Sequence, residues 1–374
     1  MKIGFDAKRL FMNYTGLGNY SRILVSNLQK YFPDNQYFLY TPKAIRNKDT
    51  EQFFNSSKFT IRENNAIFSS YWRSFSIVKD LKKDNIDVFH GLSAELPFGI
   101  HRSGIKSVVT IHDLIFKFVK EDYKLPDRII YNLKTGYACK RADKIFTISQ
   151  FTKKDLIRIY DVNPENISVI YLPVSGIFTK KYSGDVLINT KSKFNLPDRF
   201  FLYVGSVIKR KNLRIIIEAM RTIDHEELIP LVVVGNGKKY LSEIKQLVKK
   251  YSLHNKVIFL KDINNQDLPK IYQLSDFFVF PSYYEGFGLP VLEAIQSGKP
   301  VLASDNTSLV EVADNCGYFQ AFDNIDAWAG SIKKMIYEDT FPDFEKNRNN
   351  HLQKFDPETI TTEVMKEYRN LFQI

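Results

Sequence analysis

Two successive series of short apolar runs, each alternating with helix-like stretches, constrain the fold of this chain more than any other feature of the sequence. The runs are rich in branched and aromatic residues, which favours strands, and the stretches between them repeat apolar residues at helical spacing. This alternation is typical of parallel sheets covered by helices. Because the series restarts at NLPDRFFLYVG, we expect an α/β fold with two Rossmann-like domains.

The predicted elements fall on either side of a segment without clear periodicity, residues 173–197, which is rich in Pro, Gly, Ser and Lys and is the predicted linker. Before it we expect strands at 2–6, 36–41, 86–90, 107–111, 144–148 and 167–171, and helices at 18–31 and 127–142. After it we expect strands near 200–205, 230–235, 256–260, 276–280 and 300–304, and helices near 211–221, 238–252 and 290–297. The predicted domains are residues 1–175 and 176–374, with the last helix as a candidate to return to the first domain.

The composition is that of a folded protein of a reducing compartment. Cys139 and Cys316 are the two cysteines, too few for a disulfide framework and without zinc spacing. No run of 18 apolar residues occurs, and the start MKIGFDAKRL lacks the apolar region of a signal peptide. We therefore expect a cytoplasmic protein.

The basic charge is concentrated in the first half of the chain. Residues 1–175 hold 27 Lys and Arg against 17 Asp and Glu, whereas residues 176–374 hold 26 against 25. A basic domain attracts polyanions, so nucleic acid, an anionic membrane surface and a phosphorylated substrate are candidate partners. The alternative is a solvated surface that is merely rich in lysine.

Two glutamates flank a glycine-rich corner in FVFPSYYEGFGLPVLEAIQSGKPVLASD, residues 278–305. The corner follows a predicted strand, where open α/β sheets bind their ligands. Gly286 and Gly288 allow the backbone to approach a ligand, and the helix start that follows suits an anion. We expect Glu293, on the first helical turn, to accept hydrogen bonds from sugar hydroxyls and Glu285 to reach another part of the ligand. Alternatively, the glycines only shape a turn and both glutamates favour the helix dipole.

A basic cluster follows another predicted strand in LYVGSVIKRKNLRIIIEA. Lys209, Arg210 and Lys211 come between Gly205 and the next helix. Fixed cations at this place can stabilise a nucleoside diphosphate as it leaves. No Asp-x-Asp sequence or histidine cluster offers metal ligands, so we expect neither a metal nor another cofactor. The alternative is a solvated charge run.

These segments, together with LVVVGNG between them, resemble the GT-B glycosyltransferases of family 4, also called group 1 glycosyltransferases. The signature of that family is a Glu, seven residues and a second Glu, which here are Glu285 and Glu293. TGLGNYSRIL, DVFHGLS and TIHDLIF in the first half resemble the same family. The resemblance implies two Rossmann-like domains that face each other across a cleft, the first binding the acceptor and the second a nucleotide-sugar donor.

The resemblance also implies roles for residues of the second domain. Glu293 is similar to the family's ribose ligand, Glu285 to the carboxylate near the donor sugar, and Lys211 to the lysine that binds the diphosphate. Ser206 stands where the family often has arginine, and Arg210 is our candidate to supply that charge. The backbone that contacts sugar and diphosphate corresponds to Phe287, Gly288 and Leu289.

In the first domain, His112 is similar to the histidine that approaches the transferred sugar, and Gly16 and Gly18 to the loop that closes over the donor phosphates. Our catalytic candidates are thus His112, Lys211 and Glu285. A buried structural histidine is the alternative for His112, and His90 is open to either interpretation. Gly16 and Gly18 also fit part of a dinucleotide-binding pattern, but Ser21 replaces its third glycine.

The implied reaction is retaining, metal-independent transfer of a hexose from a nucleotide sugar to an acceptor hydroxyl. Likeness to bacterial polysaccharide enzymes favours GDP-mannose as donor, with UDP-hexoses next, and a saccharide or lipid-linked acceptor. We expect peripheral docking at the inner face of the plasma membrane through Arg73–Lys83 and Lys117–Lys144, with an apolar stripe of Phe75, Val78 and Leu81 in the interface. The alternative for this stripe is that it packs on the first sheet. The alternatives are a GT-B-like epimerase or phosphorylase, or a basic protein that binds nucleic acid or membranes; we expect no nucleic-acid partner.

Overall fold

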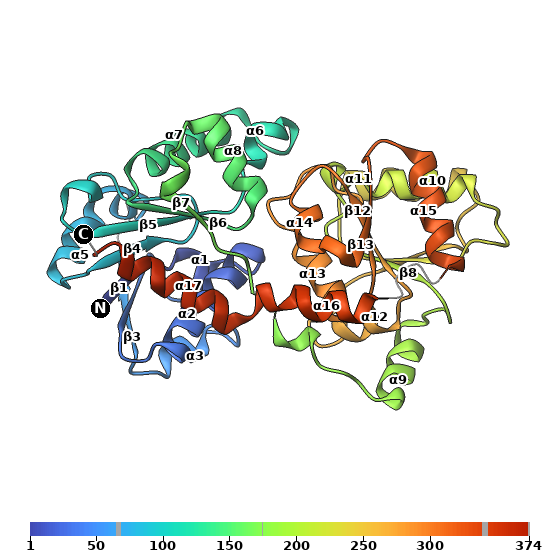
Figure 1. The fold of residues 1–374 in the computed structure, drawn as a ribbon, viewed down its shortest axis with the longest axis horizontal. Coiled ribbons are helices and arrows are strands. Elements are labelled where there is room, and N and C mark those ends of the chain that lie inside the picture. Colours follow the sequence, from blue (N-terminus) through green and yellow to red (C-terminus); the bar gives the residue numbers. More distant parts are fainter. Residues whose placement is uncertain (65–68, 174, 339–342, 373–374) are drawn as a thin grey trace. The chain divides into compact units, whose positions relative to one another are not determined.

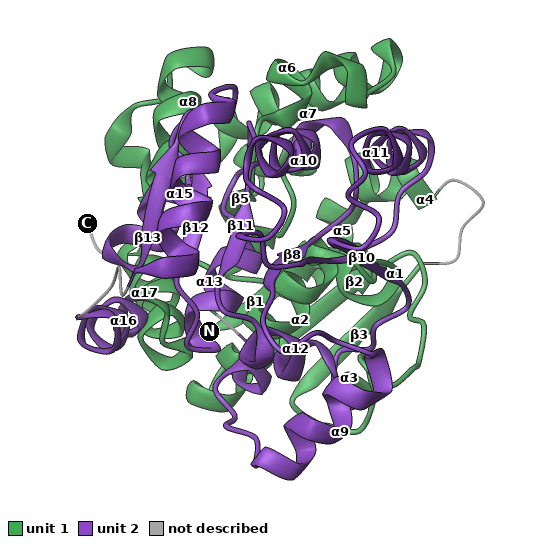
Figure 2. Cartoon of the chain, turned by 90° about the vertical axis from the view of Figure 1, so that its right-hand side faces the viewer, with its two compact units in different colours: residues 1–173, 355–374 green, residues 174–354 purple. Residues whose placement is uncertain are grey.

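The computed structural model describes residues 1–64, 69–173, 175–338 and 343–372, and it divides the chain into two compact units. The first unit contains residues 1–173 and 355–374, and the second contains residues 174–354 (Figure 2). The division at 173/174 lies close to the expected one at 175/176. The last helix, α17 (Pro357–Asn370), belongs to the first unit, so the chain passes from the first unit into the second and then back into the first.

Within its described residues, the first unit is built on a seven-stranded parallel sheet of order β3-β2-β1-β4-β5-β6-β7 (Figure 1). Ile3 pairs with Tyr37 on one side and with Val88 on the other, which sets the register at the centre. The strands are β1 (Lys2–Asp6), β2 (Gln36–Thr41), β3 (Phe59–Glu63), β4 (Val88–Gly91), β5 (Lys106–Ile111), β6 (Lys144–Thr147) and β7 (Ile167–Val169). The central strands are buried on both faces, as near-continuous apolar runs predict.

Helices cover both faces of this sheet. One face packs against a core to which α5, α7 and α8 contribute Leu81, Ala138 and Leu156, respectively. Helices α2 and α17 pack against each other. The helices are α1 (Lys8–Met12), α2 (Gly16–Tyr31), α3 (Glu51–Phe54), α4 (Ser69–Tyr71), α5 (Ile77–Lys83), α6 (Ile115–Phe118), α7 (Leu125–Arg141) and α8 (Gln150–Tyr160), with a π-helical turn at Trp72–Ser76.

The second unit repeats the architecture with a six-stranded parallel sheet, counted over the residues described, of order β10-β9-β8-β11-β12-β13. Its strands are β8 (Phe201–Val204), β9 (Leu231–Val234), β10 (Val257–Leu260), β11 (Phe278–Phe280), β12 (Val301–Ser304) and β13 (Gly317–Gln320). Its helices are α9 (Gly184–Phe194), α10 (Leu213–Thr222), α11 (Lys239–Lys250), α12 (Leu268–Leu274), α13 (Leu289–Gln296), α14 (Leu309–Ala313), α15 (Ile325–Tyr337) and α16 (Phe344–Leu352). The largest core of this unit lies between the sheet and α10, α11 and α15.

The prediction of an α/β fold with two Rossmann-like domains is confirmed, and the predicted strands are all present. Three details were wrong. The expected linker contains the helix α9, which ends at Asn195 in a left-handed conformation and packs on α12. Two edge strands, β3 and β13, were not predicted, because the first is half polar and the second begins with glycine.

The third error concerns the apolar stripe expected at Phe75, Val78 and Leu81. Leu81 is fully buried and Val78 packs against the same core, so this stripe faces the first sheet. Only Phe75 of the three is exposed. In the described part of the chain, none of the helices is both long enough and apolar enough to cross a bilayer.

Candidate active site

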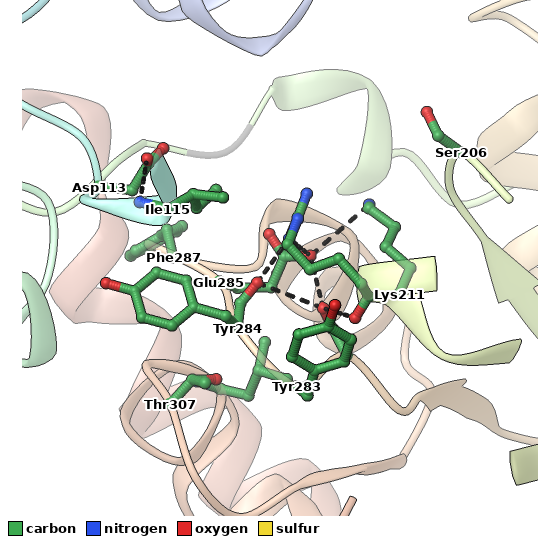
Figure 3. Close-up of polar contacts among 12 residues, drawn as sticks. Asp113, Ile115, Ser206, Lys211, Tyr283, Tyr284, Glu285, Phe287 and Thr307 are labelled. Atoms are coloured by element: carbon green, nitrogen blue, oxygen red, sulfur yellow. Dashed lines mark hydrogen bonds and ion pairs between the residues drawn. The ribbon is translucent and has the colours of Figure 1, made fainter. Parts of the chain in front are cut away.

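Two cations lie at the carboxyl end of β8. The strand leads through Gly205 into a short turn at Lys209–Lys211, directly before α10. The side chain of Arg210 is buried, and its Nη1 donates to the carbonyl of Tyr284 and lies 2.7 Å from Oε1 of Glu285. The Lys211 Nζ lies 3.9 Å from the same oxygen and 4.8 Å from the centre of the Phe280 ring. Ser206 is exposed and lies apart from this group (Figure 3).

The loop after β11 is fastened to this turn from several sides. The backbone N–H of Tyr283 donates to the carbonyl of Arg210, and the Ser282 hydroxyl donates to Glu285 Oε1 at 2.9 Å. From the start of α14, the Ser308 hydroxyl bonds the carbonyls of Glu285 and Phe287, each at 2.9 Å. The loop and the cations therefore form one preorganised cluster, which is linked by the Glu285 carboxylate (Figure 3).

Gly288 ends this loop and starts α13. It has a positive φ of 105°, and a Cβ at this position would lie 2.5 Å from Cδ2 of Leu309, so both conformation and packing require glycine. Leu289 is the first residue of α13, and Phe287 is buried beside it. The loop that contacts the two cations through Glu285 thus leads directly into α13, and the free N–H groups at a helix start suit an anion.

We had expected Glu293 on the first turn of α13. It is the fifth residue of this helix and therefore lies on the second turn. Tyr272 of α12 donates to its Oε2 at 3.1 Å. Part of the side chain is exposed, yet burial raises the pKa of Glu293 to about 7, although Tyr272 and Lys211 counteract this shift. The carboxyl group therefore changes charge near neutral pH.

The balance of charge in this corner leaves Lys211 available to a further anion. Burial lowers the pKa of Lys211 from its usual value, while Glu285 acts in the opposite direction. A distance of 3.9 Å exceeds hydrogen-bond length, so Glu285 does not occupy the donors of this ammonium group. Arg210, in contrast, is held by Glu285 and by the carbonyl of Tyr284, and it anchors the loop.

In the first unit, His112 follows β5. Its Nε2 lies 2.9 Å from the carbonyl oxygen of Leu92, so this nitrogen carries the proton and Nδ1 is the acceptor of the ring. Burial lowers the pKa of His112 to about 4, which keeps the ring neutral at pH 7. The ring of Tyr20 packs edge-on against it at 4.6 Å. A neutral histidine with a fixed tautomer can accept a hydrogen bond from a hydroxyl.

His90 lies within β4, and its ring is in the core of the first unit. It is fully buried, with Nδ1 at 2.6 Å from the Tyr368 hydroxyl of α17 and Nε2 at 2.8 Å from Oγ1 of Thr110. Burial lowers the pKa of His90 to about 3, so the ring is neutral. Because both ring nitrogens are bonded inside the core, this residue joins the last helix to the sheet.

The N-terminus of α2 is shaped by Asn13. Its side-chain oxygen accepts from the N–H groups of Thr15 and Gly18, at 2.9 and 3.2 Å. A Cβ on Gly18 would lie 1.8 Å from the Asn13 carbonyl oxygen, so this position requires glycine. Gly16 begins the helix and has open space around it. The sequence did not single out Asn13.

The first unit also contains a pocket of about 150 Å³ that sequence reasoning missed. Its polar lining includes Arg9, Glu95, His112, Asp113 and Lys134. Glu95 belongs to a chain of charges in which Arg73 contacts Asp6 at 2.6 Å and Glu95 at 3.0 Å, and Lys134 contacts Glu95 at 3.1 Å. Burial alone would raise the pKa of Asp6, but Arg73 outweighs it and holds that pKa below the usual value.

The predicted residues thus fall into two groups, one in each unit. The corner of the second unit brings together its seven predicted site residues, Arg210, Lys211, Glu285, Phe287, Gly288, Leu289 and Glu293. His112, Gly16 and Gly18 belong to the first unit. Over the ranges described, no group of three or more His, Cys, Asp or Glu side chains is arranged to hold a metal ion.

Comparison with known proteins agrees with this division. A sequence profile described as "Glycosyltransferase Family 4" matches residues 14–175, and one described as "Glycosyl transferases group 1" matches residues 187–353. The O-antigen chain mannosyltransferase B of Escherichia coli is 27% identical over 99% of this chain and 100% of its own length.

Two solved structures have the same fold over nearly their whole length. A glycosyltransferase from Rickettsia africae ESF-5 has a TM-score of 0.77 at 17% identity and covers 100% of this chain and 98% of its own. Anabaena HepE in complex with UDP-glucose has a TM-score of 0.76 at 17% identity, over 99% and 100%. Because the two profiles together span both units and carry the Glu285 and Glu293 signature, the chain belongs to the family 4, group 1 glycosyltransferases of the GT-B fold.

Proposed function

We propose that the protein is a retaining, metal-independent mannosyltransferase that uses GDP-mannose and extends a lipid-linked saccharide of a cell-surface polysaccharide. The observation that carries the donor site is the Lys211 ammonium group, which lies 3.9 Å from Glu285 in the loop that leads into α13 and keeps its donors free of that carboxylate. The choice of mannose is supported by the similarity to the E. coli O-antigen mannosyltransferase over the whole chain.

In the proposed reaction, the bond between the anomeric carbon and the diphosphate oxygen of the donor breaks, and the acceptor oxygen forms its bond on the same face. The proton of the acceptor hydroxyl moves to the leaving diphosphate. Lys211 and the N–H groups of α13 neutralise the charge that grows on this leaving group, so no divalent cation is required. Glu285 is engaged by Arg210 and Ser282, which argues against its use as a covalent nucleophile.

The remaining residues position the donor. Glu293, in its ionised form, accepts hydrogen bonds from the ribose hydroxyls of the nucleotide. His112 accepts one from a hydroxyl of the sugar through Nδ1, because its Nε2 proton is donated to Leu92. Arg210 acts through the loop it anchors and adds to the positive field around the diphosphate.

Transfer assays with GDP-mannose and with UDP-hexoses test the donor. We expect GDP to raise the Tm more than UDP or ADP, since a ligand at 100 times its Kd stabilises by about 2.7 kcal/mol. We expect NMR of the product to show the anomeric configuration of the donor. A larger shift with UDP, or an inverted product, would contradict the corresponding part of the proposal.

A UDP-hexose is the second candidate donor, because HepE has the same fold and its structure contains UDP-glucose. Incubation with each nucleotide sugar and no acceptor separates transfer from epimerisation. A new nucleotide sugar in that mixture would favour an epimerase.

A further inference from the structure

Helix α7 of the first unit carries an exposed apolar row. Leu125 and Leu133 are exposed to 63% and 64%, and Ile129 and Ile130 are about half exposed. Of the 17 residues of this helix, all of them described, only Thr135 and Ala138 are buried. The helix therefore contacts its unit through a narrow stripe, and its apolar row points away from the core.

The row continues into a ladder of aromatic rings. Tyr137, one turn after Leu133, contacts Phe98 with 4.5 Å between ring centres. Phe98 stacks on Phe75, and Phe75 on Tyr71, each at 5.0 Å. Phe75 lies in the π-helical turn Trp72–Ser76, a form of helix that occurs frequently at functional sites.

We call this continuous area, made of the α7 row and the ring ladder, the α7 surface. Its members come from three segments of the chain, namely α7, the loop after β4, and the π-helical turn with the residue before it. They are Tyr71, Phe75, Phe98, Leu125, Ile129, Ile130, Leu133 and Tyr137. Contiguous apolar areas are uncommon on soluble monomers and mark interaction sites.

Cations flank the α7 surface. Lys124 precedes the helix, Lys140 and Arg141 end it, and Arg102 is exposed in the neighbouring turn. None of these four forms an ion pair with another described residue. The acids near the helix in sequence are Glu121 and Asp122 in the turn before it, Asp127 in its first turn, and Asp143 after its end.

We propose that the α7 surface docks on an anionic lipid bilayer. Aromatic and branched side chains beside unpaired cations match the two parts of such an interface, the acyl boundary and the charged headgroups. The first half of the chain, with 27 Lys and Arg against 17 Asp and Glu, provides the long-range attraction. The docking helix is therefore α7, within the predicted range Lys117–Lys144, and not the buried stripe of α5.

Docking through α7 does not depend on the transfer reaction, but one consequence of docking rests on the proposed function. Tyr131, Lys134 and Thr135, on the other flank of α7, line the pocket that contains His112. Docking through α7 holds this pocket within reach of the headgroup layer. A lipid-linked acceptor can then place its saccharide in the pocket while its lipid stays in the bilayer.

Co-sedimentation with vesicles of phosphatidylglycerol and phosphatidylcholine tests the docking directly. We expect binding of the wild-type protein that requires phosphatidylglycerol and falls with salt. Ile129→Ser with Leu133→Ser removes apolar area that enters the bilayer on docking, and it lowers the partition coefficient by roughly tenfold or more. Replacing Lys124, Lys140 and Arg141 by Gln lowers it by about fivefold for each charge.

A matched control carries the same loss of charge elsewhere. Lys245, Lys249 and Lys250 on α11 of the second unit are exposed cations on a helix without an exposed apolar row, and their replacement by Gln leaves most of the binding intact. Circular dichroism and the nucleotide-induced Tm shift show whether each variant is folded, and that shift also tests the donor site independently of docking. Equal losses in the α11 and α7 charge variants, or unchanged binding of the Ile129/Leu133 variant, would overturn the proposal.

The other occupant of such a surface is a second copy of the chain. Sedimentation velocity without lipid distinguishes this case. The membrane assignment would be overturned if the wild-type protein did not bind anionic vesicles at low salt and instead formed a dimer that Ile129→Ser with Leu133→Ser dissociates. A monomer that binds vesicles through α7 supports it, whichever donor the transfer assay identifies.

Discussion

The two units place different chemistry at the same position of the fold, the carboxyl ends of their central strands. In the second unit, two adjacent cations and a glutamate from the neighbouring loop form a short-range cluster at the ends of β8 and β11. In the first unit, Asp6, Arg73, Glu95 and Lys134 form a chain of alternating charges drawn from four separate segments. One cluster leaves a cation available to a ligand, and the other satisfies its charges internally.

The comparison shows that a buried cation can either remain available to a ligand or stabilise the fold. Lys211 keeps its donors free of Glu285, which suits an anion that gains charge during a reaction. Arg73, with its side chain only 9% exposed, donates to the carboxylates of Asp6 and Glu95 and so stabilises the wall of the pocket that Glu95 lines. Variants of the two units should therefore separate stability from turnover.

The largest effect is expected for Arg73→Met. This change leaves the carboxylates of Asp6 and Glu95 without the cation between them, which costs about 3–5 kcal/mol of unfolding free energy. Urea denaturation at pH 7 measures the loss. Arg46→Met is the control, because its pair with Glu51 is more than half exposed on both sides and contributes below about 1 kcal/mol. Equal losses in the two variants would contradict a structural role for the buried chain.

Lys211→Ala is expected to act on turnover instead. Removing a cation that meets growing charge lowers kcat by about 100- to 1,000-fold, close to 3 kcal/mol, with a smaller change in KM. Steady-state kinetics with the donor that the transfer assay identifies give both constants. Arg214→Ala removes an exposed cation that pairs with Glu218 on α10, and it should change neither. An effect confined to KM would show that Lys211 binds donor and transition state equally.

Glu293 adds a pH dependence to the second unit. Its pKa of about 7 is above the usual value, so the folded protein binds more protons than the unfolded chain between about pH 4.5 and pH 7. Stability without nucleotide therefore falls as pH rises through this window, by up to about 3 kcal/mol. Glu293→Gln should flatten the curve of unfolding free energy against pH.

Nucleotide binding should show the opposite trend, because in the proposed function it is the ionised carboxylate that accepts the ribose hydrogen bonds. We expect the affinity of the wild-type protein to increase as pH rises through 7, and Glu293→Ala to bind weakly at every pH and to lose most of its transfer activity while it stays folded. Calorimetric titrations from pH 6 to pH 8 measure this. Wild-type affinity and turnover in the Ala variant would refute the assignment of Glu293.

The smallest effect distinguishes the two histidines of the first unit. His90→Ala leaves the buried hydroxyls of Tyr368 and Thr110 without their ring partner and costs roughly 1–3 kcal/mol of stability. His112→Ala should lower transfer with a smaller loss of stability, since the ring has one bonded nitrogen, to Leu92. Thermal unfolding and transfer rates of both variants decide between these roles, and the reverse pattern would exchange them.

Much of the fold was predictable because parallel strands and their covering helices have strong local patterns. The corner of the second unit was predictable too, since Lys211, Glu285 and Glu293 lie in short motifs that directly follow strands. The contacts of Arg210 with Tyr284 and Glu285 were not predictable, because they join residues 74 and 75 positions apart. The same holds for Tyr272 on Glu293, and for Arg73, which meets Asp6 across 67 positions.

The histidines show the limit most directly. His90 and His112 both lie at the ends of apolar runs of the first half, and the resemblance to family 4 assigned a role to His112 but left His90 open to either interpretation. The decisive contact of His90 comes from Tyr368 on α17, 278 residues further along the chain. Local sequence carries no signal for such a partner. Asn13, in contrast, is a common helix-capping residue just before α2 and was open to recognition.

The return of α17 to the first unit has a consequence for biosynthesis. As the ribosome releases the chain, residues 1–173 emerge first, but their sheet lacks the helix that bonds His90 until residues 355–374 have followed. The second unit is continuous in sequence and leaves the ribosome complete before the first unit does. Premature termination directly after residue 354 would thus yield a chain with a complete second unit and an unfinished first unit, a natural target for quality-control proteases.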